Sequence, residues 1–307
     1  MIVSVFSTML QVMIPLSIPV TVGALLGKYK QLDTKPLAVL YMYVLSPAIL
    51  LDTLNRADIS SADVTKTVAF SILNLLMLWV VARLIGRLLR LPAAEEAGLT
   101  LVSTFTNSAN YGLPLILLAF GEAGLDKASV YVITQIIIVN TIGVYYAARS
   151  QFSVRSAIRS VFALPSIYAA ILALFLHVFD LHFHAGIEKG IALVAGAYSP
   201  VVLMILGAQM VKVKGASTEQ PVRNGFWLGM TVRLLLAPLL ACLALSILHI
   251  DGTLYAVLFI LSAMPVAVNA VVLSERFQAS PQLVSKCIVW TTVASFFVLP
   301  VLIAIVR

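Results

Sequence analysis

Charged residues are scarce in this sequence. Only 11% of its 307 residues are Asp, Glu, Lys or Arg, whereas a soluble domain of this length carries about 25%. The remaining residues form apolar blocks of roughly twenty, the length that a helix needs to cross a hydrocarbon core of about 30 Å. The shortage of charge therefore excludes a soluble globular protein and indicates one that crosses a membrane several times.

Cysteines and catalytic motifs are also few. Cys242 and Cys287 lie in or beside apolar blocks, so we expect buried thiols and no disulfide. The blocks contain no Ser–His pair, no HExxH motif and no paired aspartates, so an enzyme is not predicted. One predicted outer loop gathers His177, Asp180, His182 and His184. These residues have no further ligands at a defined spacing, so we expect no metal site and no bound cofactor.

Ten apolar blocks can be counted between charged or Pro- and Gly-containing breaks. They predict membrane-spanning helices near residues 3–27, 36–54, 67–89, 97–120, 127–148, 160–179, 187–210, 224–248, 253–274 and 285–306. The connections between them are short, which leaves no room for a soluble domain. The predicted fold class is an all-α polytopic membrane protein.

The basic residues alternate between the two sides of the predicted membrane. Every second connection is basic, and together these connections hold fourteen of the twenty Lys and Arg residues. Cytoplasmic loops are enriched in Lys and Arg, so both termini are predicted outside, in the periplasm of a bacterial inner membrane. The net charge of +7 is thus a sign of topology, and no nucleic-acid partner is expected.

The chain contains two copies of one pattern. Ser46-Pro47 in the second predicted span and Ser199-Pro200 in the seventh are 153 residues apart (46 to 199), half of the chain. The same offset places the NYGLP stretch of the fourth span opposite AMPVAVN in the ninth. Five spans per half is an odd number, so the halves must have opposite orientations. The sequence predicts two inverted five-helix repeats, residues 1–150 and 151–307.

Proline and glycine are expected to break the fourth and ninth spans. Pro114 has no N–H and crowds the carbonyl of Asn110, Gly112 loosens the backbone before it, and Pro265 acts in the same way on Leu261. Unpaired backbone groups do not face lipid. The breaks therefore predict a protein-lined cavity near mid-membrane, where the two helices cross.

The broken helices favour an anion site. The N-terminal ends of half-helices carry partial positive charge and free N–H groups. Asn107, Asn110 and Asn269 offer donors and acceptors for a carboxylate. Each asparagine could instead make a hydrogen bond between helices.

The motifs NSANYGLPL and SAMPVAVNA, together with ten spans over nearly the whole chain, resemble the auxin efflux carrier family. Bacterial members of this family are similar to malonate and malate permeases. The resemblance implies a fold related to the bile-acid sodium symporters, alternating access and a homodimer as one assembly. The plant carriers have a Pro-Asn pair at each crossing and often a long cytoplasmic loop, both absent here, which argues against auxin as the substrate.

The resemblance also implies which residues bind substrate. They are Asn107, Asn110, Tyr111, Gly112, Pro114, Met264, Pro265, Asn269, Ser46, Pro47, Ser199 and Pro200. Four polar residues within the spans could support the substrate or a coupling ion: Arg233, Gln135, Asn140 and Asn74. Arg233 could neutralise a carboxylate, pair with an acidic group or extend to the headgroups. The other three could instead make structural hydrogen bonds.

Together these patterns predict a secondary transporter of small organic anions, with a dicarboxylate such as malonate or malate as the leading substrate. The alternative is a sodium- or proton-coupled symporter or exporter of a bulkier, auxin-like or bile-acid-like carboxylate. A channel is a further alternative. No Asp or Glu lies near the predicted crossing, which favours uniport, although carbonyl and amide oxygens could still hold Na⁺. The expected partners are the organic anion and the lipid bilayer.

Overall fold

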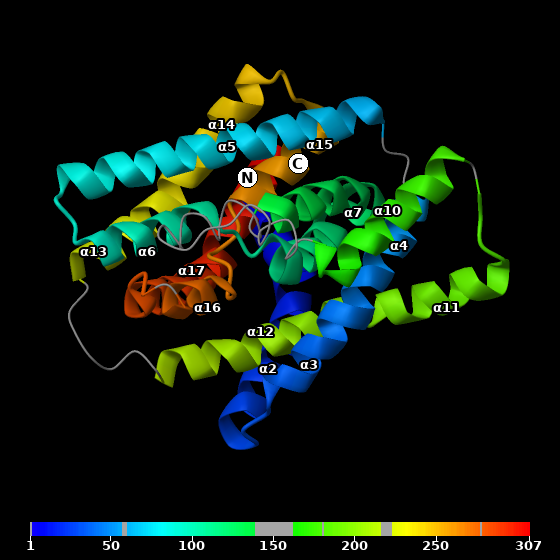
Figure 1. Ribbon diagram of the computed structural model, residues 1–307, viewed down its shortest axis with the longest axis horizontal. Coiled ribbons are helices and arrows are strands. Elements are labelled where there is room, and N and C mark those ends of the chain that lie inside the picture. Colours follow the sequence, from blue (N-terminus) through cyan, green and yellow to red (C-terminus); the bar gives the residue numbers. More distant parts are fainter. Residues whose placement is uncertain (1, 57–59, 139–161, 180, 216–222, 277) are drawn as a thin grey trace.

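The computed structural model of the protein describes residues 2–56, 60–138, 162–179, 181–215, 223–276 and 278–307, which are helical without any strand (Figure 1). The α-helices are α1 (Ile2–Thr8), α2 (Ile14–Tyr29), α3 (Thr34–Leu40), α4 (Ser46–Arg56), α5 (Ser61–Leu88), α6 (Ala93–Thr104), α7 (Leu113–Ile138), α10 (Pro165–Val178), α11 (Ala185–Gly196), α12 (Tyr198–Gly215), α13 (Arg223–Thr231), α14 (Ala237–Ile247), α15 (Gly252–Ser262), α16 (Ala270–Arg276) and α17 (Pro281–Val306).

Six helical stretches are long and apolar enough to cross a membrane: Val5–Tyr29, Thr34–Leu54, Ser61–Leu88, Ala185–Val211, Asn224–Ile247 and Pro281–Val306. They coincide with the first, second, third, seventh, eighth and tenth predicted spans. The sixth corresponds to the shorter apolar helix α10, and the fourth and ninth are divided. Part of the fifth span lies outside the described residues, as do Asn140, Asp180 and the predicted repeat boundary near residue 150. The protein is a multi-pass, all-helical membrane protein.

Several prolines in this protein lie just after a π-helical turn, in which the helix is locally wider, and do not end the helix. Four described helices contain a π-helical turn: η1 (Met9–Met13), η2 (Tyr41–Leu45), η3 (Ser108–Gly112) and η5 (Val232–Leu236). Each turn ends two residues before a proline, in order Pro15, Pro47, Pro114 and Pro238. The proline ring crowds the carbonyl four residues back, so the residue before it bonds five residues back, as Leu113 N–H does to Ser108 O. Pro19 and Pro300 are accommodated without such a turn.

The fourth span is interrupted earlier than predicted. α6 ends at Thr104, the backbone leaves the helix over residues 105–107, and η3 begins at Ser108. Asn110, Gly112 and Pro114 are therefore already helical, because the π-helical turn accommodates the proline. Gly121, whose φ is 68°, divides α7 into two helices, in agreement with the predicted break between residues 120 and 127. This glycine separates the fourth span from the fifth.

The ninth span is interrupted over residues 263–269, between α15 and α16. The prediction that Pro265 leaves the Leu261 carbonyl unpaired is wrong, because Met264 N–H bonds to that oxygen. The two interrupted segments lie against each other as a single antiparallel bridge. Asn107 N–H donates to Pro265 O at 2.8 Å, and Ala267 N–H donates to Phe105 O at 3.0 Å. These bonds satisfy backbone groups that could not face lipid.

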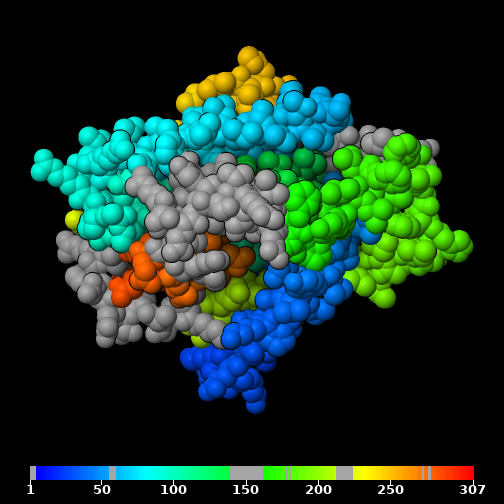
Figure 2. All heavy atoms as spheres, in the orientation of Figure 1, coloured from blue at the N-terminus to red at the C-terminus, as the bar shows by residue number. Residues whose placement is uncertain are grey.

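Long helix pairs surround this central contact. α2 packs along α12, and α4 packs along α10; α5 lies on the opposite side of the molecule from α12 in Figure 1. Figure 2 shows α5 and the pair α10–α11 at two edges of this face, with the N-terminal helices at a third. Glycines allow α2 and α12 to approach closely, because a Cβ on Gly207 would lie 1.9 Å from Val20 O and one on Gly23 would lie 2.0 Å from Met204 O.

We expect Gly207→Ala to lower the stability of the protein by about 1–3 kcal/mol, since the new methyl group must push α2 away from α12. Gly190→Ala is the matched control, because nothing lies within 4 Å of a Cβ at that position in α11. Thermal unfolding in detergent would compare the two variants. Equal melting temperatures would contradict the close packing of α2 on α12.

Candidate functional site

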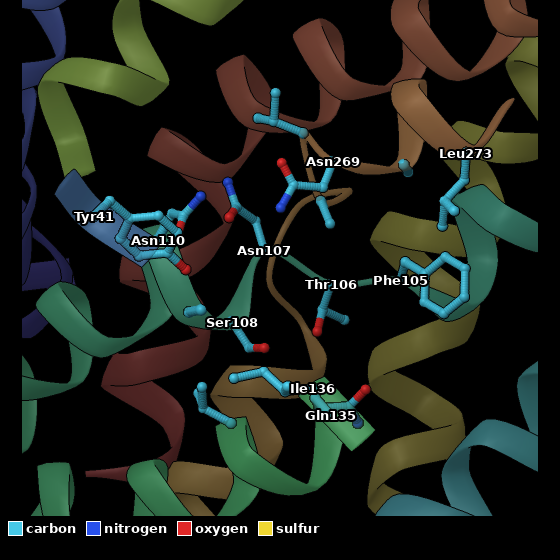
Figure 3. A pocket seen from close by; sticks show the side chains of 15 residues that line it. Tyr41, Phe105, Thr106, Asn107, Ser108, Asn110, Gln135, Ile136, Asn269 and Leu273 are labelled. Atoms are coloured by element: carbon cyan, nitrogen blue, oxygen red, sulfur yellow. The ribbon is translucent and has the colours of Figure 1, made fainter. Parts of the chain in front are cut away.

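A cavity of about 140 Å³ lies where the two interrupted segments meet (Figure 3). Its walls come from residues 105–110, residues 267–270, Tyr41 of η2 and one face of the second half of α7 that includes Gln135. None of the described residues that line it is charged. Pockets for drug-sized ligands measure roughly 300–1,000 Å³, so this cavity suits a small polar molecule.

Two asparagines that line this cavity have buried side-chain atoms without a hydrogen-bond partner among the described residues. Asn107 and Asn110 are 4% and 9% exposed. Asn107 Nδ2 and Asn110 Oδ1 have no hydrogen-bond partner among the described residues. Most buried polar side-chain atoms in proteins are paired, so these two amides are the strongest candidates to bind a ligand. In Figure 3, the side chain of Asn269 extends toward that of Asn107, which comes from the other interrupted segment.

The helix that begins at Ser108 directs its N-terminus at the same cavity. Its first intrahelical bond is donated by Tyr111 N–H to Asn107 O. The N–H groups of Ser108, Ala109 and Asn110 therefore have no partner within the helix, and all three residues line the cavity. The helix dipole adds partial positive charge at this end. The wall formed by residues 107–110 can thus bind an anion without a charged side chain.

Two tyrosines join this wall to the second and seventh spans. The rings of Tyr41 and Tyr198 are 5.9 Å apart, and Tyr198 Oη donates to Ala109 O at 3.2 Å. Sequence reasoning missed both residues, although Tyr198 directly precedes Ser199. It also missed Thr106 and Ser108, which flank Asn107 and line the cavity.

The Ser-Pro residues lie elsewhere. Ser46 forms a hydrogen bond of 2.9 Å with Ser166 and does not line the cavity described above, nor does its neighbour Pro47. Ser199 and Pro200 line a second, apolar cavity of about 480 Å³ between α2, α7 and α12, together with Pro114. The structure therefore separates these five predicted residues from the asparagines.

The remaining predicted residues lie around the two interrupted segments or in the neighbouring helices. Tyr111, Gly112, Met264 and Pro265 are buried and support the two interrupted segments; Tyr111 Oη accepts a bond of 3.4 Å from Ser295 Oγ. Of the four supporting polar residues, Gln135 lines the cavity. Asn74 is buried in α5 and does not line it.

Arg233 is fully buried in η5, so it does not extend to the headgroups. Its guanidinium donates to the carbonyl oxygens of Ser103 and Ser262. It does not line the cavity.

Comparison with known proteins agrees with this picture. Residues 5–303 match the membrane transport protein family. The chain belongs to this family. It is an auxin-efflux-carrier-like family of transporters, as the motifs of the interrupted spans indicated. The transporter is 24% identical to an uncharacterized transporter of Methanocaldococcus jannaschii over 89% of this chain and 90% of the relative. It is 25% identical to one of Methanothermobacter thermautotrophicus, over 90% of each chain.

The cavity predicts a difference in thiol labelling of the transporter. In protein with Cys242 replaced by alanine, we expect Asn269→Cys to react with a water-soluble maleimide at least about tenfold faster than Ala256→Cys. Asn269 is exposed in the cavity wall, whereas Ala256 is 4% exposed. The remaining natural thiol, Cys287, is fully buried and serves as an internal control. Equal labelling rates would show that water does not reach the cavity.

Proposed function

We propose that the protein is a secondary transporter of small organic anions, with short dicarboxylates such as malonate or malate as its substrates. The observation that supports this most directly is the small, uncharged cavity lined by a helix N-terminus and by Asn107, whose amide nitrogen has no partner among the described residues. Carboxylate oxygens accept hydrogen bonds and carry the negative charge that such an end favours. The opposed Asn269 offers amide groups to a second carboxylate.

Cavity size favours this proposal over the alternative. A space of about 140 Å³ is smaller than the roughly 300–1,000 Å³ of pockets for drug-sized ligands. A three- or four-carbon diacid fits such a space more readily than an indole ring or a steroid. A bulkier auxin-like or bile-acid-like anion would require the cavity to widen.

We further propose that the chain folds as two inverted five-helix repeats that exchange access around this cavity. Helix pairing supports the repeat: the first span packs on the seventh through α2 and α12, and the second packs on the sixth through α4 and α10. The 153-residue offset relates the first span to the sixth and the second to the seventh, so it converts one of these pairs into the other. The bridge between the fourth and ninth spans then lies on the axis that relates the halves, where transporters of this kind bind substrate.

We propose that both termini lie outside a bacterial inner membrane; polar contacts near the helix ends support the grouping of residues by side on which this orientation depends. Lys127 pairs with Asp63 at 2.6 Å, and Lys66 donates to His249 O at 3.4 Å. All four residues lie on the outer side in the predicted topology. Arg83 pairs with Glu96 at 3.3 Å on the inner side.

Counterflow in proteoliposomes tests the substrate. Vesicles preloaded with malonate, malate or indole-3-acetate should accumulate labelled malonate or malate only when the internal anion is a short dicarboxylate. Saturable exchange requires alternating access, whereas a channel would only equilibrate the label. Exchange of indole-3-acetate but of neither dicarboxylate would contradict the proposal.

Substitution of Asn110 tests both the site and the charge of the substrate. We expect Asn110→Ala to lower exchange by about tenfold to a hundredfold, because the substitution removes the amide Nδ2–H group that would donate to an oxygen of the carboxylate. Asn110→Asp should lower exchange further, since it places a carboxylate beside an anion. Asn224→Ala, at the exposed start of α13, is the matched control and should exchange like the parent. Parent-like exchange by Asn110→Asp would contradict an anionic substrate at this site.

A further inference from the structure

Arg233 joins the C-terminal ends of two half-helices. Ser103 is the penultimate residue of α6, and Ser262 is the last residue of α15. Arg233 Nη1 donates to Ser103 O at 2.9 Å, and Nη2 donates to Ser262 O. The last four carbonyls of a helix have no intrahelical partner. One guanidinium thus caps both helices at the ends that lead into the two interrupted segments.

The charges at this point balance closely. Each helix C-terminus carries about half a negative charge, so two converging ends amount to about one negative charge against the single positive charge of arginine. Arg233 is 0% exposed, and no ion pair joins it to a carboxylate among the described residues. The helix ends are therefore its main counter-charge. Its remaining neighbour of note is Tyr131 of α7, which lies within electrostatic reach.

Carbonyl oxygens at half-helix C-termini are also the groups with which transporters of this architecture hold Na⁺. In this chain the carbonyls of Ser103 and Ser262 are already occupied by a side chain on a third helix. A Na⁺ ion would have to displace a covalently attached cation from both. The position of Arg233 therefore bears on the coupling ion, which composition alone left open.

We propose that Arg233 is a built-in cation that takes the place of a coupling Na⁺ at the meeting point of α6 and α15, so that anion transport is independent of Na⁺. Arg233 is a positioning residue in this scheme, because it acts on the helix ends and does not line the cavity. The inference rests on the proposed transport function. If the inference holds, the protein transports its anion by uniport or by anion exchange, without a coupling Na⁺.

The first test uses the unaltered protein. We expect the rate of dicarboxylate exchange to be the same in Na⁺ and in choline media, and the melting temperature of the purified transporter to be unchanged by Na⁺. Strict dependence of exchange on Na⁺ would overturn the inference while leaving the proposed substrate intact. The melting measurement needs no transport, so it tests the inference even if no dicarboxylate is exchanged.

The second test removes the cation. Arg233→Gln should melt at a lower temperature and exchange at least about tenfold more slowly, and added methylguanidinium or Na⁺ should restore part of both. Arg233→Lys should retain more exchange than Arg233→Gln, because it keeps the charge. Arg83→Gln is the matched control; it removes an arginine that pairs with Glu96 near the end of α5 and should not respond to methylguanidinium.

Two results of the second test would overturn the inference. One is an Arg233→Gln protein that exchanges and melts like the parent. The other is a folded Arg233→Gln protein that neither cation stabilises. If Arg233→Gln does not fold, Arg233→Lys and the Na⁺ dependence of the parent still decide, because a merely structural arginine predicts no link between its charge and the response to Na⁺.

Discussion

Backbone pairing between two interrupted helices is the constraint on which the rest of this structure depends. A chain inside a membrane cannot leave N–H and C=O groups unpaired against lipid. Residues 105–107 and 263–269 leave their helices, and two backbone hydrogen bonds join the two segments to each other. Thr291 of α17 accepts a further bond from Val266 N–H at 3.2 Å. Because these bonds exist, four helix ends can come together in one place without a large energetic penalty.

Those helix ends divide the centre of the protein into two electrostatic regions. The carbonyl ends of α6 and α15 meet at Arg233, where a fixed positive charge compensates them. The N–H end of η3 faces a cavity that has no charged side chain among its described lining residues. Positive potential at the cavity thus comes from peptide dipoles and amides. An anion can be attracted there without forming an ion pair that would hold it too tightly to leave.

Proline shows most clearly where sequence reasoning succeeded and where it failed. The sequence correctly indicated that the fourth and ninth spans are interrupted, since both contain proline among polar residues. It placed the first interruption too late, because η3 accommodates Pro114 by bonding five residues back. The Ser-Pro repeat pointed to the second and seventh spans. Within those spans, however, the residues next to the cavity wall formed by residues 107–110 are Tyr41 and Tyr198. Helical rotation, which the motif does not specify, decides which neighbour faces the cavity.

The sequence by itself determined that this is a multi-pass helical membrane protein, because apolar length and the scarcity of charge depend only on composition and order. It also indicated the family, through the two short motifs that lie in the interrupted fourth and ninth spans. Only the tertiary structure decided which groups Arg233 contacts, since its partners Ser103 and Ser262 are 130 and 29 residues away. The same holds for the cavity. Its walls come from segments far apart in the chain, and their meeting depends on hydrogen bonds that no local pattern encodes.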